Sequence, residues 1–135
     1  MRPQPVVFPD AAAVAIDYLR PALAERGSPV PVGTRVPSPR PDRFVRIERI
    51  GGGRRDKVTD RARLDVHCWA ESEEAAHDLA TLARALLGDL PGWRGAVAYD
   101  VAEVGGPNLM PDPVTDTPRY AFAVEVSLRG KSLAL

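Results

Sequence analysis

Cysteine is almost absent from this sequence of 135 residues, with Cys68 as its single representative. One thiol cannot form an internal disulfide, and it leaves no second cysteine for a paired metal motif. Histidine is nearly as scarce, because only His67 and His77 occur and they do not form a His-x-x-x-His pair. A zinc site would have to recruit carboxylates from scattered positions. The sequence therefore predicts no metal site and no cofactor.

Aromatic residues, long apolar runs and net charge are lacking as well. Only 6% of the residues are aromatic, and they do not alternate with basic residues as in a platform that stacks single-stranded nucleic acid. No apolar run approaches the roughly 20 residues of a membrane span, and the segment 1–5 lacks the apolar core of a signal peptide. The formal net charge is zero, which argues against bulk affinity for nucleic acid. We expect synthesis in a reducing cytoplasm and no contact with a membrane.

No set of side chains in the sequence indicates catalysis. None of the serines lies in the context of a nucleophile elbow; they are Ser28, Ser38, Ser72, Ser127 and Ser132. Acidic residues gather around 71–78, where the start of a helix favours negative charge on electrostatic grounds alone. Cys68 falls on the apolar face of its predicted strand and is best interpreted as a small core residue. We therefore predict that the protein is not an enzyme.

Length and periodicity predict one α+β domain spanning residues 1–135. Apolar residues recur at helical spacing over 11–26, after the N-cap Asp10, and from Ser72 to Leu90. Pro21 predicts a kink or a restart in the first helix, and Gly27 its end. Alternation predicts five strands, at 30–36, 44–50, 61–69, 96–104 and 119–129. The order α-β-β-β-α-β-β predicts an antiparallel or mixed sheet of about five strands with two main helices packed on one face.

Proline and glycine mark the segments between these elements. Residues 1–9 are predicted to be extended, 51–60 a projecting hairpin loop, 105–118 a long proline-rich loop, and 130–135 a C-terminal tail. Loops as long as 105–118 are usually functional or mobile, and we expect Leu109 and Met110 near its tip. The prolines around Val32 and Thr34 predict an edge strand, where another chain could add a strand.

The predicted hairpin is strongly basic. Residues 46–63 contain seven Lys or Arg and three acidic residues. The loop Gly51–Lys57 carries glycines and a lysine, but a phosphate cradle needs a helix after the loop, and here a strand follows. Two interpretations remain for Arg54, Arg55 and Lys57. They form either a solvated turn or a basic arm that contacts a partner.

The two halves of the chain carry opposite charge. Residues 1–68 contain 13 Lys or Arg and 8 Asp or Glu, whereas residues 69–135 contain 5 and 10. If the halves occupy different faces, the basic side of one subunit could dock on the acidic side of the next. If the sheet mixes the halves, no face is polarised.

Four segments are distinctive when taken with the order of the elements: 43–47, 51–53, 60–70 and the Ala- and Leu-rich helix that begins at Ser72. In this order they resemble the tail terminator proteins of long-tailed, siphovirus-type phages, especially those that infect actinobacteria. The high content of Ala, Arg, Pro and Gly fits such a GC-rich source. The resemblance covers residues 11–128.

This resemblance implies a virion structural protein of the tail or neck. Its subunits would form a ring, usually hexameric, that caps the completed tail tube, stops its polymerisation and presents a surface to the head-side connector, with DNA passing through the channel. The implied partners are copies of the chain itself, the tail tube protein and the head–tail connector or stopper protein, with non-specific proximity to DNA. We expect seven residues to contact partners or the channel: Arg54, Arg55, Lys57, Val32, Thr34, Leu109 and Met110.

Two other functions remain open at this point. A head-completion or stopper protein of the phage neck belongs to the same class. A small nucleic-acid-binding or regulatory module that uses the Arg54–Lys57 loop belongs to a different one. Affinity that falls steeply with added salt would identify the nucleic-acid module.

Overall fold

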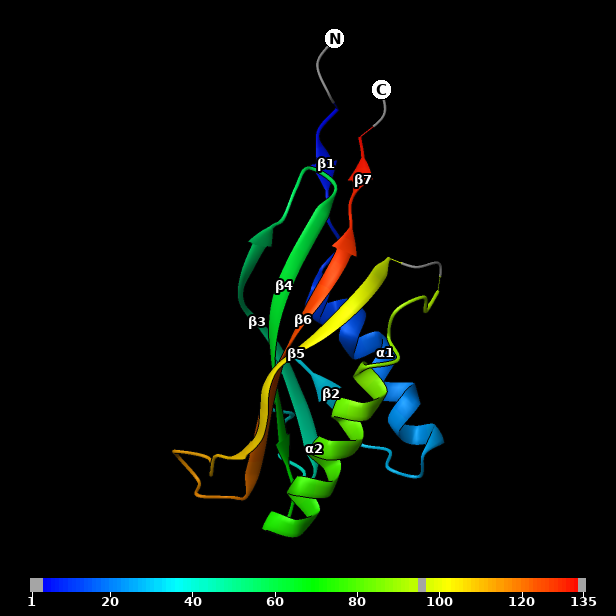
Figure 1. Cartoon of the computed structure of the whole chain (residues 1–135). Coiled ribbons are helices and arrows are strands. Elements are labelled where there is room, and N and C mark those ends of the chain that lie inside the picture. Colours follow the sequence, from blue (N-terminus) through cyan, green and yellow to red (C-terminus); the bar gives the residue numbers. More distant parts are fainter. Residues whose placement is uncertain (1–3, 95–96, 134–135) are drawn as a thin grey trace.

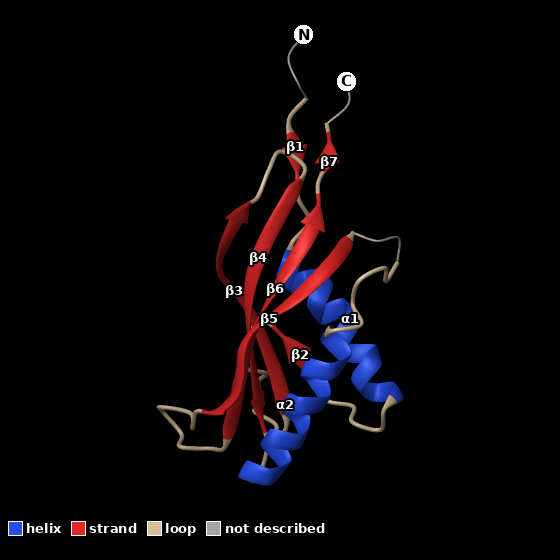
Figure 2. Cartoon of the chain, viewed as in Figure 1, coloured by secondary structure: helices blue, strands red, loops and turns tan. Residues whose placement is uncertain are grey.

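The computed structural model describes residues 4–94 and 97–133 and shows an α+β domain in which two helices cover one face of a twisted sheet (Figures 1 and 2). Its elements are β1 (Val6–Val7), α1 (Ala11–Glu25), β2 (Val32–Gly33), β3 (Phe44–Arg54), β4 (Thr59–Trp69), α2 (Glu73–Leu87), β5 (Ala98–Leu109), β6 (Arg119–Arg129) and β7 (Lys131–Ser132). The predicted fold class and the order of the main elements are confirmed.

The main sheet has the strand order β2-β3-β4-β6-β5. It is mixed, because β2 runs parallel to β3 while every other neighbouring pair is antiparallel. The strands β4 and β6 pair without a register shift from Thr59↔Arg129 to Trp69↔Arg119. This uninterrupted pair forms the centre of the sheet, with β3 beside β4 and β5 beside β6.

Both helices begin at side chains that satisfy free backbone N–H groups. Asp10 accepts a hydrogen bond from the backbone N–H of Ala13 at 3.1 Å, and Ser72 Oγ accepts one from the N–H of Ala75 at the same distance. The helix α1 continues through Pro21 without a restart. Its end at Gly27 is confirmed, since Gly27 adopts a φ of +79°, which favours glycine.

The hydrophobic core lies between the helices and one face of the sheet. Alternate residues of the central strands point into it, among them Leu64, Val66 and Cys68 of β4. The two helices also contact each other, and the Tyr18 hydroxyl donates a hydrogen bond of 2.7 Å to the carbonyl oxygen of Leu86. Cys68 is fully buried, which raises the pKa of its thiol, so this side chain is a core residue as its strand pattern predicts.

Strand boundaries differ from the predicted ones at the glycines of β3 and β5. The strand β3 continues through its three glycines to Arg54, so only residues 55–58 form the turn of the hairpin. The strand β5 continues to Leu109, which shortens the loop 105–118 to residues 110–118. Its predicted start, Ala96, lies outside the described residues. Gly106 permits the extension, because it adopts a φ of +90° and an added Cβ would lie 2.6 Å from the Ala121 carbonyl oxygen.

The chain ends form a second, small sheet. β1 pairs antiparallel with β7, with Val6 opposite Ser132 and Val7 opposite Lys131. This two-stranded sheet lies beside the tip of the β3–β4 hairpin, at the end of the molecule opposite the loop 110–118 (Figure 1). Within the described residues, no helix is both long and apolar enough to cross a membrane.

Candidate interaction surfaces

One face of the main sheet carries no helix. On β4, every second side chain points into the core, and the side chains between them point to this open face. The residues of β3 and β6 that pair directly with these outward-pointing residues lie on the same face. Opposite charges face each other there, as in the pair Arg63↔Glu125. The charged residues that the register places on this face are Arg46, Arg61, Arg63, Arg119, Arg129, Glu48, Asp65, Asp100 and Glu125. Five arginines against four acidic residues leave the face nearly balanced.

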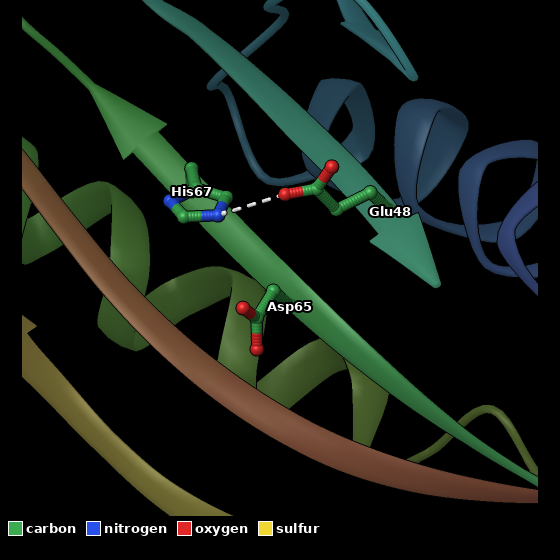
Figure 3. A group of neighbouring side chains, drawn as sticks. All are labelled: Glu48, Asp65 and His67. Carbon is green, nitrogen blue, oxygen red and sulfur yellow. Dashed lines mark ion pairs between the residues drawn. The ribbon is translucent and has the colours of Figure 1, made fainter. Parts of the chain in front are cut away.

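A small polar cluster lies at the centre of the open face. Figure 3 shows Glu48 of β3 and His67 of β4 pointing toward one another, with 3.6 Å between His67 Nε2 and Glu48 Oε1, and Asp65 beside them. One ligand atom of each of the three residues lies within 4.8 Å of the other two. Glu48 is already bound, because Arg46 donates a hydrogen bond of 2.8 Å to its carboxylate.

Two observations weigh against a cation at this cluster. Burial, followed by the positive charge of Arg119, lowers the pKa of His67; the neutral imidazole is the form that binds metals, so it is the nearby charge of Arg119 that opposes a cation. Arg63 lines the same open hollow, of about 280 Å³, as Asp65 and His67. The cluster is best described as part of the mixed charge pattern of the open face.

The hairpin tip holds the three basic residues that we singled out in the sequence. The turn is fixed by its own backbone, since the Arg55 N–H donates to the Thr59 carbonyl oxygen at 2.9 Å. Arg54 faces the first strand, where its guanidinium donates to the Val6 carbonyl oxygen at 3.4 Å and lies 5.3 Å from the Phe8 ring. All three side chains are exposed, and they differ in that Arg54 also contacts the chain start, whereas the side chains of Arg55 and Lys57 make no hydrogen bond in the described part of the chain.

The predicted edge strand at 30–36 is reduced to the two residues of β2. Val32 is 3% exposed and belongs to the core, so its side chain is not a surface contact as we had expected. Its carbonyl oxygen accepts a hydrogen bond of 2.7 Å from Arg20, and that of Thr34 accepts one of 3.1 Å from Arg46. Arginine side chains therefore already occupy acceptors that an added strand would use.

The loop 110–118 is anchored by the carboxylate of Asp112. Asp112 Oδ1 accepts hydrogen bonds from the backbone N–H groups of Val114 and Thr115, at 2.9 and 3.2 Å. Asp112 Oδ2 accepts from Trp69 Nε1 at 3.0 Å and from Arg40 at 3.2 Å. These bonds hold the pKa of Asp112 well below its usual range, with the Val114 N–H making the largest contribution. The loop is therefore fastened to β4 and is not a free arm.

The apolar tip of this loop is Val114, which is 90% exposed. Leu109 and Met110, predicted near the tip, lie at its base, where the Met110 N–H donates to the Arg119 carbonyl oxygen at 2.8 Å. Both remain partly exposed and stay candidates for a partner contact. Sequence reasoning missed Val114 and the anchor Asp112, although an Asp whose carboxylate accepts from N–H groups two and three residues onward is a common turn signal.

Comparison with known proteins gives one family. The family model described as phage tail termination protein matches residues 7–133, which is nearly the whole chain. No curated protein matches the sequence.

Proposed function

The chain belongs to the phage tail termination protein family, and from this membership we propose that its copies form a ring, with six subunits, that caps the tail tube. As a member, it is a structural protein of the phage tail. The ring would stop polymerisation of the tube and join the tail to the head-side connector. The match over residues 7–133 is the observation that carries this proposal.

The two ends of the molecule supply the two different surfaces that such a ring needs. Strands of 11 residues separate the hairpin tip from the loop 110–118 by about 35 Å. In a ring whose axis follows the strands, these ends become the two axial faces. One presents Arg55, Lys57 and the exposed Val58, and the other presents Val114 and Met110. We propose that one end contacts the tail tube protein and the other the connector.

A ring also needs contacts between subunits. Head-to-tail contacts use two different patches of each copy, and they form a closed ring when the rotation between copies permits.

The mixed charge of the open face suits a channel through which DNA passes without being held. Arginines would meet phosphates only weakly, since the neighbouring carboxylates nearly cancel their charge.

The test is to measure the mass of the purified chain by light scattering, alone and with the tail tube protein, and to image tube ends by electron microscopy. We expect ring-shaped caps at one end of the tubes, and tubes of uncontrolled length when the chain is omitted. Tubes of the same length with and without the chain would refute the proposal. Binding to random duplex DNA that falls steeply with salt would support the nucleic-acid module instead.

A further inference from the structure

The two outer strands of the main sheet each leave a stretch of backbone without a strand partner in the described part of the chain. On β3, the short β2 pairs only with Val45 and Arg46, so the outer edge has no strand partner from Ile47 to Arg54, and its one side-chain contact at the Gly51 carbonyl oxygen is a hydrogen bond of 3.0 Å from the exposed Arg49 Nε. On the other side, β5 is the last strand of the sheet. Bare edges of this kind are templates for pairing with another chain, and proteins normally block or use them.

Two successive rows of the sheet reach both edges at the same level, although β3 shifts register between Arg49 and Gly51 and Gly52 has a φ of +81°. Gly53 pairs with Arg61, Arg61 with Ser127, and Ser127 with Asp100, so Gly53 and Asp100 end one row across four strands. The next regular row runs in the same way from Gly51 to Ala102. Below this level β5 is interrupted by register shifts on both sides of Gly105 and by Pro107. The pairing-competent edges are therefore Gly51–Arg54 and Asp100–Glu103.

Strand direction fits these edges to each other in a cyclic assembly. The three antiparallel steps from β3 to β5 make the two outer strands antiparallel. Rotation about an axis along the strands preserves direction and height. The β5 edge of one copy therefore meets the β3 edge of the next at the same level and in antiparallel orientation.

Charge and side-chain size also match. The strand β3 carries three Arg and one Glu, whereas β5 carries one Asp, one Glu and no basic residue. Arg46, Arg49 and Glu103 are paired inside the subunit, which leaves Arg54 on β3 and Asp100 on β5 without an ion pair among the described residues. Gly53 has no positive φ, and a Cβ there would meet nothing within 4 Å, so the subunit itself does not require glycine at this position. A glycine without an internal reason on a strand edge is typical of a place where another backbone comes close.

We propose that the edge Gly51–Arg54 of one copy pairs with the edge Asp100–Glu103 of the next, so that the main sheets continue through the subunit contact. This inference rests on the proposed ring and adds the surface by which its copies join. Each copy offers one edge of each kind, so closure of the ring leaves neither edge free, as in a closed barrel. An open chain would leave one edge of each kind free at its ends.

Cysteine cross-linking tests this contact directly. Within one subunit, β3 and β5 are separated by three strand spacings, about 14 Å, whereas a disulfide needs Cα atoms within about 7 Å. The double variant Gly53→Cys/Asp100→Cys can therefore form this bond only between copies. A second double variant, Gly53→Cys/Ala102→Cys, covers a stagger of two residues along the strands, as strand tilt would produce. The native Cys68 is fully buried and does not interfere.

The control variant is Gly53→Cys/Asn108→Cys, which keeps the cysteine on β3 and places the second about 20 Å lower on the same β5 edge. Oxidised rings, prepared alone or on tube ends, should shift in non-reducing gels from the 14.6 kDa band to a ladder of its multiples for at least one test pair. The control should stay at 14.6 kDa.

The possible outcomes distinguish failure of the edge contact from failure of the proposed ring. Rings visible in the microscope with no ladder from either test pair would overturn the edge contact and leave the proposed function standing. A ladder from the control as strong as from the test pairs would also overturn it, because cross-linking would then not report position. Absence of rings under all conditions would overturn both.

Discussion

Replacing Asp112 by Asn tests whether one carboxylate fastens the loop 110–118 to the sheet. Asp112 is 8% exposed and accepts four hydrogen bonds. Asparagine can keep the acceptor for the two backbone N–H groups, but it places an amide NH₂ against Trp69 Nε1 and the Arg40 guanidinium. Neither of those groups can accept a hydrogen bond.

The expected cost follows from the donor that is left without a partner. A buried donor that loses its acceptor costs about 1–3 kcal/mol, and the bond of Trp69 to Asp112 is buried. The partly exposed pair with Arg40 adds little. We expect Asp112→Asn to lower the free energy of unfolding by about 2 kcal/mol at neutral pH, a large part of the stability of a typical domain.

The pH dependence has a definite sign. The folded state holds the pKa of Asp112 below the ordinary value of 3.8. Stabilisation by the carboxylate is therefore complete above that value and is lost as the pH falls below it. Asparagine does not titrate, so the difference in stability between the native chain and the variant should shrink in acid.

Urea unfolding followed by tryptophan fluorescence measures this difference at neutral pH and near pH 3. The matched control is Asp116→Asn in the same loop, because Asp116 is exposed and its side chain makes no hydrogen bond to the described residues. A variant within about 0.5 kcal/mol of the native chain at neutral pH, the usual range of surface substitutions, would refute the reasoning. A difference that persists unchanged in acid would refute the part played by charge.

Three further predictions concern the hairpin and the core. Charge reversal of Arg55 and Lys57 should leave the thermal melt within the range of a surface change but reduce the yield of joined particles, counted by electron microscopy; undiminished yield would contradict a partner contact at the tip. Gly52→Ala should destabilise the subunit by at least about 1 kcal/mol, because Gly52 has a φ of +81° and an added Cβ would overlap the backbone of β4. The control Gly53→Ala should not destabilise it, and equal urea midpoints for the two variants would contradict this prediction. The Cys68 thiol should react with a colorimetric disulfide reagent only after denaturant is added, and rapid labelling of the folded chain would show that the core opens.

The parts of the fold that could be predicted are those with a local signal. The strand β6 matches its predicted bounds, because its alternation is regular and both faces are distinct. The N-caps Asp10 and Ser72 are confirmed for a similar reason, since a cap depends on a side chain and an N–H group three residues away.

The parts that could not be predicted depend on contacts between distant residues. Gly106 looks like a loop signal in the sequence, and only the neighbouring strand β6 shows that it lies in an edge strand. The pairing of Val6 with Ser132 joins segments from opposite ends of the chain and leaves no local pattern. This pairing also explains why Arg54 is not free, since the first strand supplies the carbonyl oxygen that it binds. The predicted partner contact at Val32 is wrong because alternation alone does not show whether the apolar side of a strand faces a partner or the core.

The opposite charges of the two halves of the chain do not form opposite faces in the folded protein. The strand β4 of the basic half pairs along its whole length with β6 of the acidic half, so the halves interleave at the centre of the sheet. What remains is a difference between the outer edges, with β3 net basic and β5 net acidic. Part of this charge is used inside the subunit, because Arg49 pairs with Asp60 and Glu103 with Arg84. Arg54 and Asp100 have no ion pair in the described part of the chain, and the width of the sheet separates them within one copy. The fold therefore removes the charge asymmetry from the faces, where it would favour DNA or a flat partner, and keeps it where a head-to-tail ring would use it.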